Sequence, residues 1–264
     1  MIDGALPYLR CPNCERALRR DDRVLRCARG HSFDLARQGY ADLTAGRLPH
    51  VGDTAAMIAD RDTFLTRGHY DFIAEALATF VPGGLVVDAG VGTGRYLARV
   101  LDRAPAATGL GLDVSKPALR RAARAHPRAA AVLADVWRPL PIVDEAADAV
   151  LNVFAPRNGA EFRRILRPGG RLLVVTPAAG HLAELVDAYR LIGVDPEKDE
   201  RVREALGEYF ELEDVETRRR ELDLTAEEVR TLIGMTPSAR HREDGDTAAI
   251  TTGAEVEIRL YNPV

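Results

Sequence analysis

The sequence predicts an α/β fold in which a doubly wound, mostly parallel sheet follows a small N-terminal metal-binding module. Two observations carry this prediction. From residue 83 onward, short apolar segments alternate with helical ones, which is typical of parallel strands joined by crossover helices. Before that point, all three cysteines of the chain lie within the first 30 residues, and His31 follows closely. We therefore expect a module over 1–48, a helical linker over 49–82 and a main domain over 83–264.

The N-terminal cysteines have the spacing of a metal site. Cys11, Cys14, Cys27 and His31 form the pattern C-x2-C-x12-C-x3-H, and two ligand pairs separated by about a dozen residues are typical of structural zinc. The N-terminus lacks a secretory signal pattern, so metal binding is favoured over disulfide bonds. The alternative is three unrelated buried thiols and a histidine in a turn, but chance rarely confines every cysteine to one such window.

Composition describes a globular protein, since 46% of the residues are hydrophobic and 29% are charged. No run of 18 apolar residues occurs, so we expect a cytoplasmic protein with no membrane partner. The net charge is −4, yet residues 1–50 contain nine arginines and six acidic residues, a net of +3. That basic excess suggests an anionic partner for the module, although solvated surface arginines explain it equally well.

The module and the linker are expected to hold short elements. Alternating faces predict a strand over 23–26, and a second extended piece is expected over 39–43. Glycine and proline mark a loop over 46–53. Two helices should follow, one over 54–66 with Asp53 or Thr54 as its cap, and one over 70–80.

The main domain is expected to begin with five strands. They are predicted at 85–88, 108–113, 130–133, 149–154 and 171–175. Helices are predicted between them at 95–103, 116–125 and 161–166. The last third offers helices near 181–190 and 226–233 and a strand at 254–260.

A glycine-rich loop directly after the first of these strands is the main candidate for a ligand site. Gly90, Gly92 and Gly94 follow Asp88 and open the next helix, so the backbone can approach a ligand at the helix N-terminus. Asp113 ends the second strand, 19 residues past Gly94. A carboxylate there can accept hydrogen bonds from both ribose hydroxyls. This pattern fits a dinucleotide or S-adenosylmethionine.

Two further acidic positions favour S-adenosylmethionine. Asp88 would repel a pyrophosphate but suits the cationic amino end of S-adenosylmethionine, and the loop reads G-x-G-x-G rather than G-x-G-x-x-G. Asp135, just past the third strand, is placed to accept from an adenine amino group. Each acid alone could be a solvated carboxylate at a strand end. Three of them at consecutive strand ends favour a cofactor site.

These segments resemble known enzymes at two levels. Val86–Gly94, Leu112-Asp113 and Leu166–Gly170 resemble class I S-adenosylmethionine-dependent methyltransferases. A longer set, from about Cys11 to Tyr261, resembles the 23S ribosomal RNA guanine-N1 methyltransferase family, which includes macrolide-resistance enzymes of antibiotic producers. The segments are Cys11–Cys14, Cys27–His31, Gly39-Tyr40, Gly52–Thr54, Phe64-Leu65, Gly68–Tyr70, Gly111–Lys116, Phe154–Pro156 and Met235–Pro237.

The resemblance implies a Rossmann-like class I methyltransferase sheet, seven-stranded and mostly parallel, with a zinc-ribbon-like module. Zinc would be bound by Cys11, Cys14, Cys27 and His31. Tyr70, the turn at Tyr96–Leu97 and His181 would contact the cofactor, in addition to the glycines and acids named above. Without the resemblance, the two tyrosines are core aromatics and His181 is a helix-capping residue. The resemblance also implies a homodimer whose two zinc modules help to form an RNA cleft.

The implied reaction is methyl transfer to N1 of a guanine in a 23S rRNA hairpin, with a possible effect on macrolide resistance. Asn152 and Phe154 lie where this fold usually meets its target base, so they are candidates for a base-edge hydrogen bond and for stacking. They could equally be a strand-end polar group and a core aromatic. The sequence names no general base. Arginines of the module would contact phosphates, namely Arg10, Arg16, Arg19, Arg20, Arg26 and Arg29.

The chain departs from the family pattern at three places. Val91 stands where a cysteine is common, Arg157-Asn158 follows Pro156, and Ser238–Arg242 follows Pro237 where aromatic residues are often seen. Two alternative functions therefore stay open. One is a small-molecule, natural-product methyltransferase with a structural zinc module, and the other is a non-catalytic RNA-binding protein.

Overall fold

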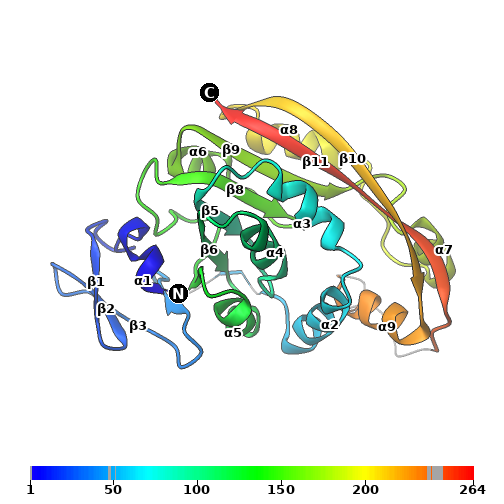
Figure 1. The fold of residues 1–264 in the computed structure, drawn as a ribbon, viewed down its shortest axis with the longest axis horizontal. Helices are drawn as coiled ribbons and strands as arrows, with labels where there is room; N and C mark the ends of the chain where they lie inside the picture. The colour runs from blue at the N-terminus through cyan, green and yellow to red at the C-terminus, as the bar shows by residue number, and fades with distance from the viewer. Residues whose placement is uncertain (1, 47–48, 51, 237–238, 240–245) are drawn as a thin grey trace.

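The computed structural model describes residues 2–46, 49–50, 52–236, 239 and 246–264. A small antiparallel sheet lies at the N-terminal end, beside one large sheet flanked by helices (Figure 1). The small sheet has the order β1-β2-β3. Its strands are Leu18–Asp21, Val24–Cys27 and Ser32–Asp34, and they follow α1 (Ile2–Ala5) and a 3-10 helix (Leu6–Tyr8).

The large sheet has eight strands among the described residues, in the order β10-β11-β9-β8-β5-β6-β7-β4. In that order they are Phe210–Leu224, Ile250–Pro263, Leu166–Pro177, Ala147–Val153, Gly84–Ala89, Ala107–Asp113, Ala129–Leu133 and Ala41–Asp42. All pairs from β9 to β4 are parallel, whereas β11 and β10 are antiparallel. The chain runs outward from β5 to β7 and then returns to β8 on the other side of β5. The crevice at such a switch point is where open α/β sheets bind ligands.

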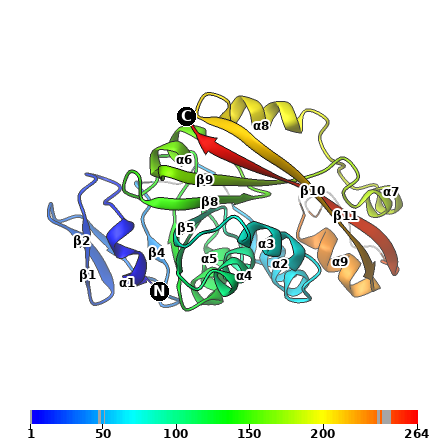
Figure 2. The same cartoon turned by 45° about the horizontal axis from the view of Figure 1, so that its top comes forward.

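Helices cover both faces of the large sheet. They are α2 (Ala55–Thr66), α3 (Asp71–Ala78), α4 (Arg95–Arg103), α5 (Lys116–Ala125), α6 (Gly159–Ile165), α7 (Ala183–Tyr189), α8 (Lys198–Leu206) and α9 (Ala226–Gly234). One buried cluster joins the sheet to α2–α5, α7 and α9, and a second joins it to α1, α6, α8 and the module. Along β5 the side chains alternate between the two, with Val86 in the first cluster and Leu85 and Val87 in the second. Figure 2 shows these layers from a second direction.

Local capping chemistry explains where several helices begin. The side chains of Thr54, Ser115, Asn158 and Thr225 each accept a backbone N–H from the first turn of α2, α5, α6 and α9. α4 instead begins after Gly94, which has a left-handed φ of 83°. These helices lie within a few residues of their expected positions. None of the described helices is long and apolar enough to cross a membrane.

The structure corrects the expected strand count from seven to eight. The additional strand is β4, a two-residue segment of the N-terminal module that pairs in parallel with β7. The sequence analysis also predicted no helix at the position of α8 and no strand at the position of β10. β10 is almost wholly exposed, with Phe210, Leu222 and Leu224 as its buried residues, so it lacks the alternation that marks a half-buried strand.

Candidate functional site

A cleft of about 750 Å³ opens at the carboxyl ends of β5, β6, β7 and β8. Seven of the expected cofactor residues line it, namely Tyr70, Gly90, Gly92, Tyr96, Asp113, Asp135 and His181. Phe154 also lines it, while Asp88, Gly94, Leu97 and Asn152 belong to the layer outside the lining. The sequence motifs therefore converge on one cavity, although they come from six separate segments of the chain.

Asp88 lies at the end of β5 with a side chain that is almost fully buried. Its Oδ1 atom has no hydrogen-bond partner among the described residues. Burial, with a further contribution from the charge of Asp113, raises the pKa of Asp88 to about 8. An unpartnered buried carboxyl oxygen beside the glycine loop is what a cationic amino group would satisfy, so this residue fits the amino end of S-adenosylmethionine.

The loop after Asp88 depends on its glycines. Gly90, Gly92 and Gly94 have φ values of 94°, 53° and 83°, in the left-handed region that side chains disfavour. A Cβ on Gly94 would lie 2.9 Å from Ala122 Cα, so this glycine lets α4 pack closely on α5. Gly92, Thr93 and Tyr96, around the start of α4, line the cleft, so a ligand in the cleft can approach this helix N-terminus.

Asp113 is held rigidly at the end of β6. Its two carboxylate oxygens accept backbone N–H groups from Gly92, at 2.9 Å, and from Ser115, at 2.8 Å. Burial raises its pKa, and these hydrogen bonds oppose that shift. The carboxylate still lines the cleft, and an ionised carboxylate has lone pairs left for ribose hydroxyls.

Asp135 has partners that the sequence did not reveal. Its Oδ2 lies 2.8 Å from Nδ1 of His50, and its Oδ1 accepts the N–H of Trp137 at 3.1 Å. His50 and Trp137 both line the cleft, with ring centroids 6.5 Å apart. An adenine amino group at Asp135 would therefore share this carboxylate with the linker histidine.

Four aromatic rings form one wall of the cleft. The hydroxyl of Tyr70 lies 3.3 Å from Nε2 of His181, and the ring of Phe154 lies 6.5 Å from Tyr70 and 6.1 Å from His181. Tyr96 completes the wall from α4. Burial lowers the pKa of His181 to about 4, so this histidine is neutral near pH 7. Neutral rings beside a sulfonium offer their π faces to the cation.

Tyr96 and Leu97 lie in the first turn of α4, within the helix expected over 95–103. The side chain of Leu97 is 2% exposed and lies in the core. A Cβ atom on Gly109 of β6 would lie 3.1 Å from Cδ2 of Leu97, so this side chain packs against β6. Because the side chain of Leu97 is buried in the core, only its backbone could contact a cofactor.

Asn152 and Phe154, the two candidates for the target base, differ in placement. Asn152 is fully buried, and its amide nitrogen donates to the carbonyls of Ala89, at 3.2 Å, and Pro156, at 2.8 Å. It thus ties the glycine loop to the 154–156 segment from outside the cleft lining. Phe154 is 39% exposed in the cleft and has a φ of 51°. A strained backbone holding an exposed aromatic ring is typical of functional positions.

The sequence analysis missed Arg61, which projects from α2 toward the cleft. It donates to Asp53 at 2.5 Å and to the carbonyl of Met235 at 2.9 Å. Its Nη1 would lie 3.6 Å from a Cβ on Gly92. No local motif marks it, because its position depends on the packing of the linker helices against the main domain.

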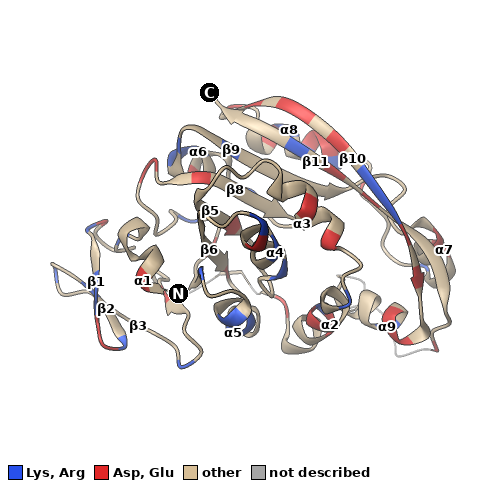
Figure 3. Ribbon diagram, in the orientation of Figure 1, with Lys and Arg blue, Asp and Glu red and all other residues tan. Residues whose placement is uncertain are grey.

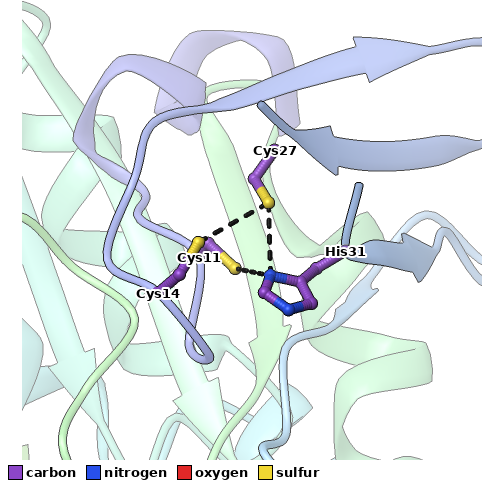
Figure 4. A group of neighbouring side chains, drawn as sticks. All are labelled: Cys11, Cys14, Cys27 and His31. Carbon is purple, nitrogen blue, oxygen red and sulfur yellow. Dashed lines mark hydrogen bonds between the residues drawn. The ribbon is translucent and has the colours of Figure 1, made fainter. Parts of the chain in front are cut away.

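The four N-terminal candidates form a cluster whose ligand atoms all lie within 4.8 Å of one another (Figure 4). Sγ of Cys11 and of Cys27 lie 3.5 and 3.3 Å from Nδ1 of His31, and Sγ of Cys14 lies 3.6 Å from that of Cys27. Tetrahedral zinc bonds to sulfur and nitrogen imply ligand separations of roughly 3.3–3.8 Å. The donor set and its spacing therefore fit one structural zinc ion.

Basic and acidic residues both occur on the N-terminal sheet (Figure 3), and three of the six arginines proposed as phosphate contacts have acidic partners. Arg10, Arg20 and Arg26 form ion pairs with Asp144, Asp3 and Asp21. Arg16, Arg19 and Arg29 are exposed, and no acidic group of the described residues lies within ion-pair distance of them. Of these six arginines, only the last three have charge that is free for a phosphate.

Comparison with known proteins agrees with this geometry. A family model described as RlmA, N-terminal, matches residues 9–45, and one described as Methyltransferase domain matches residues 86–170. A protein solved in complex with the Haloferax volcanii Trm112 methyltransferase activator, and named only provisionally as a methyltransferase, has the same fold, with a TM-score of 0.52 and 20% identity over 80% of this chain and 98% of that one. The fold, cleft and cysteine cluster define a class I S-adenosylmethionine-dependent methyltransferase with a structural zinc module.

Two relatives narrow this class. The Streptomyces fradiae 23S rRNA (guanine(748)-N(1))-methyltransferase is 50% identical over 94% of this chain and 91% of its own. A Micromonospora griseorubida protein, whose name assigns it provisionally to 23S rRNA (guanine-N(1)-)-methyltransferases, is 53% identical over 100% of both chains. The chain belongs to the 23S rRNA (guanine-N1)-methyltransferase family.

Proposed function

We propose that this protein transfers a methyl group from S-adenosylmethionine to N1 of a guanine in a 23S rRNA hairpin. The observation that carries the proposal is the 50% identity to the Streptomyces fradiae enzyme over nearly the whole length of both chains. It extends through both the zinc module and the methyltransferase domain. The exposed ring of Phe154, which lines the cleft next to Tyr70 and His181, supports an aromatic acceptor.

In this proposal the cofactor lies across the carboxyl ends of β5, β6 and β7. Asp88 holds its amino group, Asp113 its ribose hydroxyls and Asp135 its adenine amino group, while Gly90, Gly92 and Gly94 supply the close backbone approach. Tyr70, Tyr96, the Leu97 backbone and His181 contact it as well. When bound, S-adenosylmethionine supplies an activated methyl group on a sulfonium. The protein has mainly to place the acceptor nitrogen in line with it.

The target guanine would stack on Phe154, because a base must leave its helix or lie in a loop before N1 becomes reachable. Asn152 acts as a positioning residue that fixes the 154–156 segment against the glycine loop. N1 carries a proton that must leave. Hydrogen bonding to O6 would make that proton more acidic, and the proposal assigns no general base.

The zinc module would bind the RNA backbone, with Arg16, Arg19 and Arg29 as its free cations. Their exposure and lack of acidic partners support this role. The family resemblance extends the proposal to a homodimer in the cytoplasm, with two zinc modules beside one RNA cleft. It also extends to protection of the ribosome against a macrolide.

The proposal is tested by methylation of a protein-free 23S rRNA hairpin transcript with labelled S-adenosylmethionine. We expect one methyl group, mapped to N1 of a single guanine by mass spectrometry. Transfer to a small metabolite, with no transfer to the transcript, would instead support the natural-product alternative. Light scattering tests the dimer, and growth of a sensitive host expressing the gene on macrolide plates tests resistance.

A further inference from the structure

The cleft continues past the cofactor wall to the segment that leads into α8. Its lining includes Phe154, Ala155 and Pro156 after β8, together with Asp195 and Lys198, the first residue of α8. Lys198 therefore lines the same cleft as Phe154 and His181 of the aromatic wall. A cation therefore stands at the acceptor end of the cleft.

A second cation lies in the loop that continues from the cleft lining at Pro156. Arg157 follows Pro156 in the loop between β8 and α6, and it is half-buried. Its Nε atom is buried with no hydrogen-bond partner, and the described residues place no carboxylate in an ion pair with it. Burial lowers the pKa of Arg157. Arg157 lies two residues before α6, a helix that packs against α8, and Lys198 is the first residue of α8.

The nearby carboxylates are engaged with other arginines. Asp195 pairs with Arg201 at 2.9 Å, and Asp199 pairs with Arg259 at 2.5 Å. No ion pair within the described residues neutralises Arg157 or Lys198. A half-buried guanidinium without a partner is unfavourable for the protein alone, and this cost is recovered when an anion binds there.

We propose that Arg157 and Lys198 form a phosphate-binding subsite that holds the RNA backbone next to the target guanine. This inference rests on the proposed function and names a contact that the zinc module does not make. The guanidinium offers two parallel donors to phosphate oxygens, and the ammonium adds a point charge. The target base would then stack on Phe154 while Arg157 and Lys198 bind its phosphate from an adjacent side.

The cofactor's carboxylate is the competing anion for this subsite. Arg61 is the cation that lies over the glycine loop, 3.6 Å from the Cβ position of Gly92. Lys198 instead begins α8, and Arg157 lies in the loop before α6, a helix that packs against α8. This arrangement assigns Arg61 to the cofactor and the other two cations to the RNA.

The test compares Arg157→Ala and Lys198→Ala with Arg203→Ala, a matched control. Arg203 lies on the same helix as Lys198, but it is exposed and paired with Glu200. Binding of a fluorescent 23S hairpin transcript is measured between 50 and 200 mM KCl, values chosen within the range where phosphate contacts dominate. S-adenosylmethionine affinity is measured by calorimetry on the same proteins.

We expect each subsite variant to bind the transcript about tenfold more weakly, with a slope of log affinity against log salt that is shallower by about 0.7. The control should stay within about twofold, and cofactor affinity should not change in any variant. Arg157→Lys should restore most of the affinity and the slope, which a purely structural role would not produce. Thermal midpoints establish that each variant is folded.

Three results would overturn the subsite. The first is unchanged transcript affinity and slope in both alanine variants, while the wild-type protein methylates the transcript. The second is a loss confined to S-adenosylmethionine affinity, which would assign the cations to the cofactor. The third is a wild-type protein that neither binds nor methylates the transcript, which would overturn the proposed function together with the subsite.

Discussion

Asp88 holds a carboxyl group that the folded protein leaves partly unsatisfied, because Oδ1 is buried without a partner. We expect Asp88→Asn to weaken S-adenosylmethionine binding by tenfold or more, since a hydrogen bond to a charged group contributes about 1.5–3 kcal/mol. The same change should raise the thermal midpoint of the cofactor-free protein, because it removes a buried acid. Calorimetry and thermal melts measure the two effects. A lower midpoint with unchanged affinity would contradict the assignment.

The raised pKa of Asp88, about 8, also predicts a pH dependence of cofactor binding. Binding a cationic amino group needs the ionised form of Asp88, so affinity should rise as pH increases toward 8. Titrations at pH 6, 7, 8 and 9 measure this trend, and Asp88→Asn should flatten it. The same raised pKa has the opposite effect on folding stability, which should fall as pH increases. A buried acid with a raised pKa contributes stability at low pH that is lost as pH rises through 8.

Phe154 is expected to act on the acceptor rather than on the cofactor. Phe154→Ala should lower kcat/KM for the transcript about 10- to 100-fold, since base–aromatic stacking contributes about 1–3 kcal/mol. Affinity for S-adenosylmethionine should change by less than about threefold. Phe154→Tyr keeps the ring and serves as the matched control. Equal losses in the alanine and tyrosine variants would argue against stacking.

At the scale of elements, β5, the glycine loop and α4 could be predicted closely because local chemistry determines them. The apolar run before Asp88 and the left-handed positions of Gly90, Gly92 and Gly94 are visible in the sequence. β10 is different, since its acidic first half and its arginines (Figure 3) resemble a solvated segment. Pairing with β11 makes it a strand, and a long-range partner cannot be read from local periodicity.

The same distinction, between features set by local sequence and features set by long-range packing, holds within the site. Asp88, Asp113 and Asp135 could be proposed from the sequence because each lies at the end of a predicted strand or just past it. The contacts of Arg61 with Met235 and of His50 with Asp135 join segments 174 and 85 residues apart. Such contacts depend on how α2 and the linker pack against the main domain. A single sequence carries no signal for them.

Helix α9 offers a test of how the linker is fastened to the main domain. Glu228 completes a capping box with Thr225 and lies 2.8 Å from Nε2 of His69. Its backbone hydrogen bond with Thr225, followed by the contact with His69, lowers the pKa of Glu228 to about 2. We expect Glu228→Ala to cost about 1–2 kcal/mol of unfolding free energy at pH 7.

The pH dependence of the stability lost in Glu228→Ala gives a second check. A lowered carboxyl pKa contributes stability above its unfolded value of 4.5, and this contribution is lost as pH falls toward 2. The difference between wild type and Glu228→Ala should therefore narrow below pH 4.5 in urea titrations. Glu227→Ala, an exposed neighbour in the same turn, serves as the control. A difference that is constant with pH would contradict the ionic contribution.

At the scale of the whole molecule, the zinc module is continuous with the main domain. β4 pairs with β7, and Leu9 forms a bridge with Ile142. One buried cluster contains Cys11 and Cys27 together with residues of β5, β6 and β8. The metal site therefore rests on the same core as the sheet, and the cofactor cleft opens at the carboxyl edge of that sheet.

This continuity predicts how the protein responds to loss of zinc. Cys14→Ser, with zinc content measured by plasma mass spectrometry, should release the metal and shift one cooperative melting transition to lower temperature, because the module shares its core with the sheet. Transcript binding should fall more than S-adenosylmethionine binding, since the free arginines belong to the module whereas the cofactor residues do not.

Ser32→Ala, an exposed position on β3 in the same module, serves as a control that keeps the metal. A separate low-temperature transition, with the main one unchanged, would show that the module folds independently. One equivalent of zinc retained by Cys14→Ser would contradict the ligand assignment.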